Sequence, residues 1–187
     1  MPVVPLSLQE LAFQFKRDQM TPPLASFAQY FRIGLEVGLC EPDEARDWAI
    51  SVIDQMDAPP GEIIEVSWRK PLAQLIADLK EVNGQPEMDL VCQWLLGRVS
   101  MTMDCTHDSL DRAVRQARGI AQAAGDSDLY HIFDVIEDRL RLAEMQVFGT
   151  VDACREDFDK ALKEHGTPPF SIPGAQRTSA IGASAVV

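Results

Sequence analysis

The stretch DAPPGEIIEVSW, residues 57–68, decides which fold class the chain adopts. Two adjacent prolines and a glycine precede an apolar run that could be a strand, but no second run in the chain alternates convincingly enough to pair with it. A flexible linker would be polar, whereas this stretch carries Ile63, Ile64, Val66 and Trp68 within six positions. We therefore predict a folded corner, in which the prolines end one helix and a short helical turn buries Ile63 and Ile64, with Trp68 as a further candidate.

On both sides of this corner, apolar residues recur with the period of a helix. The clearest example is the helix predicted to start at Pro42, where Ala45, Trp48 and Ala49 begin an apolar face that continues to Met56. The other predicted helices cover about residues 8–15, 22–38, 71–84, 87–103, 109–124, 127–148 and 151–165. The helices at 87–103 and 127–148 carry apolar residues on two sides, so we expect both to be well buried.

These patterns predict an all-α, single-domain protein of seven to eight helices, packed as an irregular antiparallel bundle or array. The helical domain is expected to cover residues 1–166, and the proline-rich and small-residue segment 167–187 is expected to be a tail. No signal peptide or membrane span is recognisable, and the four cysteines include no CxxC pair. We expect a cytoplasmic protein with reduced thiols that does not bind membranes.

The negative charge of the chain is concentrated in one segment. The formal net charge is −12, and residues 36–65 hold nine acidic residues against one base, Arg46. A field of this sign repels nucleic-acid phosphates and anionic lipid, and it attracts basic surfaces. We therefore expect no nucleic-acid binding and favour another protein with a basic surface as the partner. The candidate partner-binding residues are Glu36, Glu41, Asp43, Glu44, Asp47, Asp54 and Asp57.

A second constellation could carry chemistry. His131, Asp134 and Asp138 share one flank of a predicted helix, so an imidazole and two carboxylates could converge on a cation or a water molecule. A metal-dependent helical hydrolase would also need ligands from a second helix, and the chain offers only two other histidines. The alternative is a histidine bonded to a neighbouring carboxylate at a solvated edge.

The remaining patterns favour a protein without catalytic activity or cofactor. The sequence contains no glycine-rich phosphate loop, GxSxG elbow or HExxH helix. Cys105 and His107 lie two residues apart, but no second pair accompanies them to complete a zinc site. Arg112, Arg115 and Arg118 point outward from their predicted helix, which is typical of a solvated face and would also suit an acidic partner.

Residues 35–68 resemble a segment of small bacterial all-helical proteins. The shared features are a glycine-leucine helix end, an acidic helix with Trp48-Ala49, and the corner from Asp57 to Ser67. Such proteins resemble, in size and character, cytosolic immunity proteins encoded beside secreted toxins. The resemblance implies a non-enzymatic inhibitor that neutralises a basic toxin by imitating phosphate. The hydrolase and a helical adaptor with an incidental acidic face stay open as alternatives.

Overall fold

The computed structural model describes residues 22–104 and 106–169. The helix predicted at 8–15 and most of the predicted tail lie outside the described residues. Within them the chain contains helices and no strand, which confirms the all-α, single-domain prediction. Across these same ranges, none of the helices combines the length and apolar character that crossing a membrane requires. The helices are α2 (Leu24–Glu36), α3 (Pro42–Gln55), α4 (Gly61–Ser67), α5 (Leu72–Lys80), α6 (Met88–Thr102), α7 (His107–Ala124), α8 (Ser127–Glu144) and α9 (Val151–His165).

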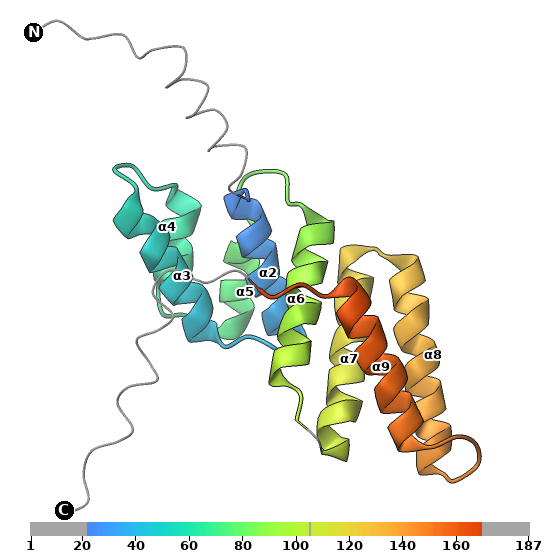
Figure 1. The fold of residues 1–187 in the computed structure, drawn as a ribbon. Coiled ribbons are helices and arrows are strands. Elements are labelled where there is room, and N and C mark those ends of the chain that lie inside the picture. The colour runs from blue at the N-terminus through green and yellow to red at the C-terminus, as the bar shows by residue number, and fades with distance from the viewer. Residues whose placement is uncertain (1–21, 105, 170–187) are drawn as a thin grey trace, which may run out of the picture.

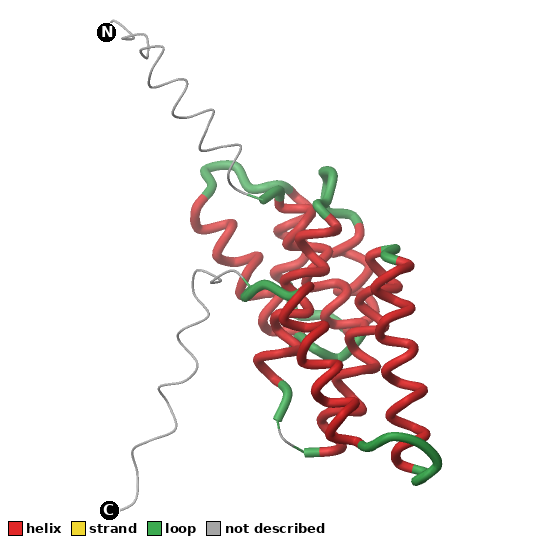
Figure 2. The backbone as a smooth tube through the Cα atoms, turned by 45° about the vertical axis from the view of Figure 1, so that its right-hand side comes forward, coloured by secondary structure: helices red, strands yellow, loops and turns green. Residues whose placement is uncertain are grey.

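Helix α6 lies at the centre of the molecule (Figure 1). Helices α2–α5, which we call the N-terminal group, lie on one side of it, and α7–α9, the C-terminal group, lie on the other. Figure 2 shows the same helices from another side, joined by short loops. The prediction that helix α6 is well buried is confirmed, because it buries residues on several sides. Those residues are Val91, Cys92, Trp94, Leu95, Leu96, Gly97 and Val99.

The N-terminal group is built around aromatic side chains from three helices. Phe27 of α2 stacks on Trp94 of α6 with 5.5 Å between ring centroids. Phe31, one turn further along α2, packs on Trp48 of α3 at 5.4 Å and meets the edge of Tyr30 at 5.1 Å. Offset and edge-to-face contacts of this kind add to the free energy gained by burying the rings. Helix α3 is therefore fixed to α2, and α2 to α6.

The corner at residues 57–68 is helical, as predicted. Pro60 precedes α4, and α4 buries Ile63 and Val66 completely. Residues three apart lie on the same side of a helix, so Val66 takes the place that we predicted for Ile64, which is only partly buried. The prediction for Trp68 is wrong, since its side chain is 56% exposed and lies beneath the ammonium of Lys70, 5.6 Å from the ring centroid.

Helix α8 ends earlier and is more exposed than the sequence predicts. It stops at Glu144 instead of residue 148, and a turn with positive φ at Gln146 (56°) and Gly149 (77°) leads the chain into α9. Phe133 of α8 packs edge-on against Phe158 of α9 at 5.7 Å, so one flank of α8 is buried as expected. The second flank is not, because Val135 and Leu142 remain about 40% exposed.

The chain that follows α9 is fixed to α6 at a glycine. The backbone amide of Thr167 donates a hydrogen bond to the carbonyl of Gln93, with 3.0 Å between nitrogen and oxygen. At this crossing a Cβ atom on Gly97 would lie 1.8 Å from the carbonyl oxygen of Thr167. Only glycine leaves enough space for the two backbones to approach so closely. The first residues of the predicted tail are thus packed against α6.

Candidate functional site

Helix α3 carries the candidate binding residues on a firmly held support. Ala45, Trp48 and Ala49 are buried on one side of the helix. Trp48 contacts two rings of α2, Phe31 and, at 6.2 Å, Phe27. A helix anchored by a buried tryptophan presents its opposite face in a defined position.

The first turn of α3 is held by its own acidic residues. Glu41 and Glu44 form a capping box, in which each side chain accepts a hydrogen bond from the other residue's backbone N–H. Nη2 of Arg98 also donates hydrogen bonds to both carboxylate oxygens of Glu44, at 2.7 and 2.8 Å. Arg98 reaches back from α6 and donates from Nε to the carbonyl of Leu39 at 3.1 Å. Both glutamates therefore have a structural role, because their carboxylates accept hydrogen bonds from within the protein.

Arg98 belongs to a largely buried polar cluster with two further titratable groups. Its Nη1 lies 3.4 Å from the hydroxyl of Tyr30, and the thiol of Cys40 is close to both. Burial raises the pKa of Tyr30 and the pKa of Cys40 to about 12 each. A thiol that stays protonated at neutral pH is a poor nucleophile. The cluster is thus suited to holding α2, α3 and α6 together, and Cys40 is not suited to covalent catalysis.

The outward face of α3 carries a row of residues that we call the α3 stripe: Asp43, Asp47, Ile50 and Asp54. At 100° per residue these four positions fall within about 60° of one another around the helix. All four side chains are exposed, and Ile50 is 45% exposed between two carboxylates. Asp43 pairs with Arg46, whereas Asp47 and Asp54 form no ion pair with any described residue. The stripe therefore combines unneutralised negative charge with one apolar contact point.

The structure divides the seven predicted acidic residues into two sets. Asp43, Asp47 and Asp54 lie together on the α3 stripe, and Asp57 is exposed in the loop that follows α3. Glu36 lies apart from them on α2, where it pairs with Arg32 at 2.8 Å and approaches Lys80 at 3.8 Å. Together with the capping glutamates and Asp43, which pairs with Arg46, four of the seven have partners within the fold. The four aspartates are the candidate binding residues that remain on display.

Sequence reasoning missed two parts of this site. Ile50 was not among the candidates, although its position between Asp47 and Asp54 follows from the helical period. Arg98 was not recognised as the residue that fixes Glu44. Its signal was a lone basic residue within the apolar helix 88–102, where an unpaired charge would be costly to bury.

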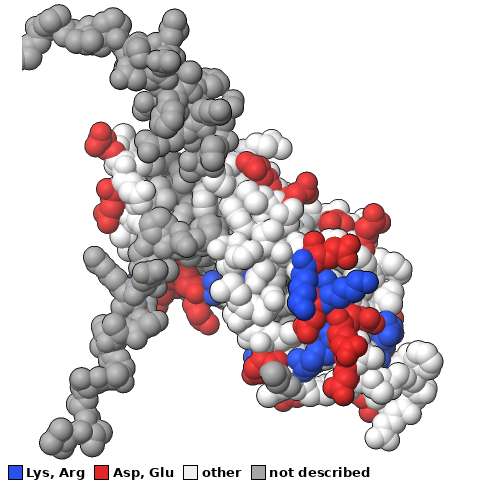
Figure 3. All heavy atoms as spheres, in the orientation of Figure 1, with Lys and Arg blue, Asp and Glu red and all other residues white. Residues whose placement is uncertain are grey.

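The space-filling view shows the same asymmetry over a wider area (Figure 3). Acidic residues on the side of α3 and α4 have few basic neighbours, whereas acidic and basic residues interleave over α7–α9. The basic residues of the C-terminal group include two that bridge helices. Arg118 of α7 pairs with Asp134 and Glu137 of α8, and Arg139 of α8 pairs with Asp157 of α9.

The His131 group does not assemble into a site. Asp134 turns towards α7, where its carboxylate lies 3.1 Å from Arg118. Asp138 is exposed and 3.6 Å from Arg141, while His131 lines a groove between α8 and α9. No three His, Cys, Asp or Glu residues of the described ranges gather closely enough to hold a metal ion. His107 lies elsewhere, with its Nε2 3.1 Å from a carboxylate oxygen of Glu144.

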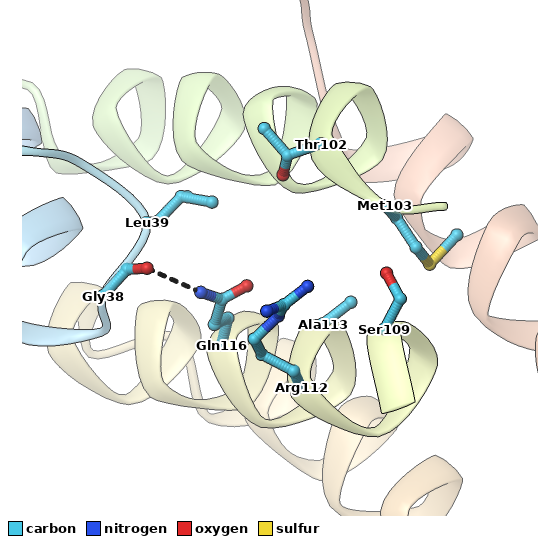
Figure 4. Close-up of a pocket in the computed structure, with 8 residues that line it drawn as sticks. All are labelled: Gly38, Leu39, Thr102, Met103, Ser109, Arg112, Ala113 and Gln116. Carbon is cyan, nitrogen blue, oxygen red and sulfur yellow. Dashed lines mark hydrogen bonds between the residues drawn. The ribbon is translucent and has the colours of Figure 1, made fainter. Parts of the chain in front are cut away.

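A small polar pocket lies between the ends of α6 and α7 (Figure 4). Its volume is about 130 Å³, and the Arg112 side chain extends along it between Gln116 and Ser109. The amide of Gln116 donates to the carbonyl of Gly38 at 3.1 Å, which ties α7 to the turn before α3. The lining residues include no histidine, cysteine or carboxylate, so the pocket lacks a general base. Of the three predicted outward arginines, only Arg112 forms no ion pair with a described residue.

Comparison of the chain with protein-family models, with curated proteins and with solved structures found no match. The inference about function therefore depends on the surface of this molecule alone.

Proposed function

We propose that this chain is a non-enzymatic helical protein that binds a basic partner protein through the α3 stripe. The observation that supports this most directly is the pair of unneutralised carboxylates, Asp47 and Asp54, on either side of exposed Ile50. Elsewhere in the molecule, acidic side chains are commonly used in ion pairs between or within helices. A charge left without a partner on a rigid helix is available to another molecule.

Such a surface would attract a basic partner from a distance and would also supply an apolar contact in the bound complex. Concentrated negative charge steers a basic partner and raises the rate of encounter. An apolar side chain at the centre of the contact area supplies the desolvated core that charged rims alone do not provide. Ile50 is placed to fill that role. Binding of this kind should weaken as salt is added, because screening acts on exposed charges.

A basic toxin such as a nuclease is the partner class that best fits this chemistry, and this chain would then be its immunity-type inhibitor. A nuclease binds phosphates through basic residues, and a row of carboxylates can bind to those same residues. The same negative field disfavours nucleic acid as the direct ligand.

The test compares two double variants that each remove two exposed carboxylates from a helix. Asp47→Asn/Asp54→Asn alters the α3 stripe, and Glu156→Gln/Glu164→Gln alters α9. Asp43 is left unchanged because it also stabilises the first turn of α3. Both variants and the unaltered protein serve as bait in lysate of the organism that encodes the chain. The bound protein is then identified, produced and titrated against each bait at several salt concentrations.

We expect a basic partner whose affinity falls at least about tenfold in the α3 variant, falls with salt, and is unchanged in the α9 variant. A partner bound equally well by both variants would contradict the proposal, as would binding that is insensitive to salt. An adaptor with an incidental acidic face would give the first of these results.

The hydrolase alternative has a separate and inexpensive test. Purified protein would have to carry a stoichiometric cation that is lost in His131→Ala and retained in His165→Ala. No contact among the described residues favours this alternative, because Asp134 is engaged by Arg118. Finding such a cation would replace the binding proposal for this molecule.

A further inference from the structure

Exposed apolar side chains are concentrated on α8 and the turn after it. Of the eleven large hydrophobic residues that are clearly exposed in the described part of the chain, six lie between residues 132 and 148. Their exposed fractions range from 37% to 67%. Exposed apolar side chains gathered in one part of a surface often mark an interface. The six residues are Ile132, Val135, Leu142, Met145, Val147 and Phe148.

The helical residues of this set lie on one face of α8. At 100° per residue, Ile132, Val135, Arg139 and Leu142 fall within about 80° of one another. Beside them runs an open groove of about 430 Å³ between α8 and α9, lined by Ile132, Val135 and Ile136 from α8 and by residues of α9. We call this surface the α8 face. In Figure 1, α8 lies at the outer edge of the molecule, away from α2–α5.

The α8 face is complementary to itself when two copies run antiparallel. A two-fold axis between residues 138 and 139 pairs residue i of one copy with residue 277 − i of the other. Val135 then faces Leu142 of the second copy, and Ile132 faces Met145. At the centre, Asp138 faces Arg139, and the symmetry makes every one of these contacts twice.

Charge selects this arrangement over the parallel one. A parallel pair in register would place Asp138 opposite Asp138 and Arg139 opposite Arg139, which is repulsive. Asp138 is 68% exposed, and its contact with Arg141 is long, at 3.6 Å. Arg139 bonds Asp157 through Nη1 alone, so other N–H groups of its guanidinium are available to a second carboxylate.

We propose that the α8 face is a homodimer interface in which two copies of α8 pack antiparallel about an axis between Asp138 and Arg139. The occupant is a second copy of this chain, because one α8 face supplies both members of each contact. Val135 meets Leu142 of the other copy, and Asp138 meets the oppositely charged Arg139. The α3 stripe lies on the other side of α6, so the dimer leaves both stripes accessible.

The test measures molar mass by sedimentation equilibrium at physiological ionic strength. We expect the unaltered protein to reach twice the 20.7 kDa of one chain as its concentration rises. Val135→Lys/Leu142→Lys should abolish association, whereas Met101→Lys, at an exposed apolar residue of α6, should leave it unchanged. Thermal unfolding of each variant verifies that the monomer is folded.

Charge reversal tests the register independently of the apolar contacts. Asp138→Arg and Arg139→Asp should each weaken self-association at least about tenfold, since like charges then meet twice at the axis. Mixing these two variants should restore a dimer, because both central contacts become attractive. The double variant Asp138→Arg/Arg139→Asp should also dimerise.

Three results would overturn the proposal. One is a monomeric mass for the unaltered protein at every concentration up to about 1 mM, a Kd too weak for a specific interface. Another is a dimer that persists in Val135→Lys/Leu142→Lys. The third is two charge-reversed variants that are monomeric alone and fail to associate when mixed while remaining folded.

Discussion

The two sides of α6 use their acidic residues in different ways. In the C-terminal group, carboxylates of one helix meet arginines of the next, as Arg118 does with Glu137 at 2.9 Å. In the N-terminal group, residues 36–65 hold nine acids and one base. Glu44 and Glu65 pair with bases from outside this segment, whereas Asp47, Asp54 and Asp57 form no ion pair with a described residue. A helical protein can thus use the same residue types to join its helices on one side and to present charge on the other.

The cores on the two sides differ in a related way. The N-terminal group joins α6 through aromatic rings, with Trp48 and Trp94 among them. Among its described residues the C-terminal group shows the ring contact of Phe133 with Phe158 and packs aliphatic residues such as Leu110 and Ile120. Large rings bury much area per residue. The short helices α4 and α5 are instead held by fully buried aliphatic side chains, Ile63 and Val66 on α4 and Leu75 and Leu79 on α5.

The largest effect is expected from removing the anchor of the α3 stripe. Trp48→Ala should lower the free energy of unfolding by about 3–5 kcal/mol, because a buried ring is lost and a cavity remains. Trp68→Ala is the matched control, since the ring is mostly exposed, and it should cost about 1 kcal/mol or less. Urea unfolding of both variants measures the difference. Equal losses would contradict the role assigned to Trp48.

A smaller loss should follow from closing the space at Gly97. Gly97→Ala places a methyl group where the carbonyl of Thr167 lies, and overpacking of this kind costs about 1–3 kcal/mol. Gly61→Ala has no neighbour within 4 Å and should raise stability by about 0.4–1 kcal/mol. Thermal and urea unfolding compare the two. A stabilising Gly97→Ala would show that residues 166–167 do not pack on α6.

The two groups should also differ in the strength of their ion pairs. A double-mutant cycle on Arg98 and Glu44, which are 19% and 35% exposed, should give a coupling energy of about 1–2 kcal/mol. The same cycle on Arg115 and Asp111, an exposed pair of the C-terminal group, should give about 0.3–0.5 kcal/mol. A stronger coupling in the exposed pair would reverse the comparison.

Alkaline pH should act chiefly on the N-terminal group and α6. Burial raises the pKa of Tyr30, Cys40 and Cys92 to about 12 each, above their ordinary values of 10.0 and 9.0. These groups ionise first in the unfolded chain, so their contribution to stability is complete below pH 9 and is lost as pH rises towards 12. We expect the free energy of unfolding to be insensitive to them near neutral pH.

Replacing one thiol isolates this effect. Cys92→Ala should show a shallower decline of the unfolding free energy between pH 9 and 12 than the unaltered protein does, because one ionisation is removed. Chemical unfolding at several pH values measures the slope. An unchanged slope would show that the thiol of Cys92 ionises equally easily in the folded and unfolded chains.

Local pattern predicted much of the fold. The period of apolar residues gave the start of α3 at Pro42, and Gly125, with φ of 76°, ends α7 as expected. The corner at residues 57–68 was recognised as helical because a lone strand would leave backbone groups unpaired. The end of α8 was missed because Val147 and Phe148 continue the apolar pattern into a turn that exposes them.

Contacts between distant residues were beyond the reach of local pattern. Glu44 was expected on the surface, but Arg98, 54 residues away, binds it. Asp134 was expected beside His131, but Arg118 of the preceding helix draws its carboxylate to α7. In both cases a charge was placed correctly on its helix, and its partner depended on how the helices pack.

The central claim is that the α3 stripe, and not acidic residues in general, attracts a basic ligand. Backbone amide shifts in NMR spectra, followed during titration with a lysine-rich peptide, test it without knowledge of the natural partner. We predict shifts concentrated in residues 43–57, reduced in Asp47→Asn/Asp54→Asn and reversed by salt. Shifts spread equally over the acidic residues of α7–α9 would contradict the claim.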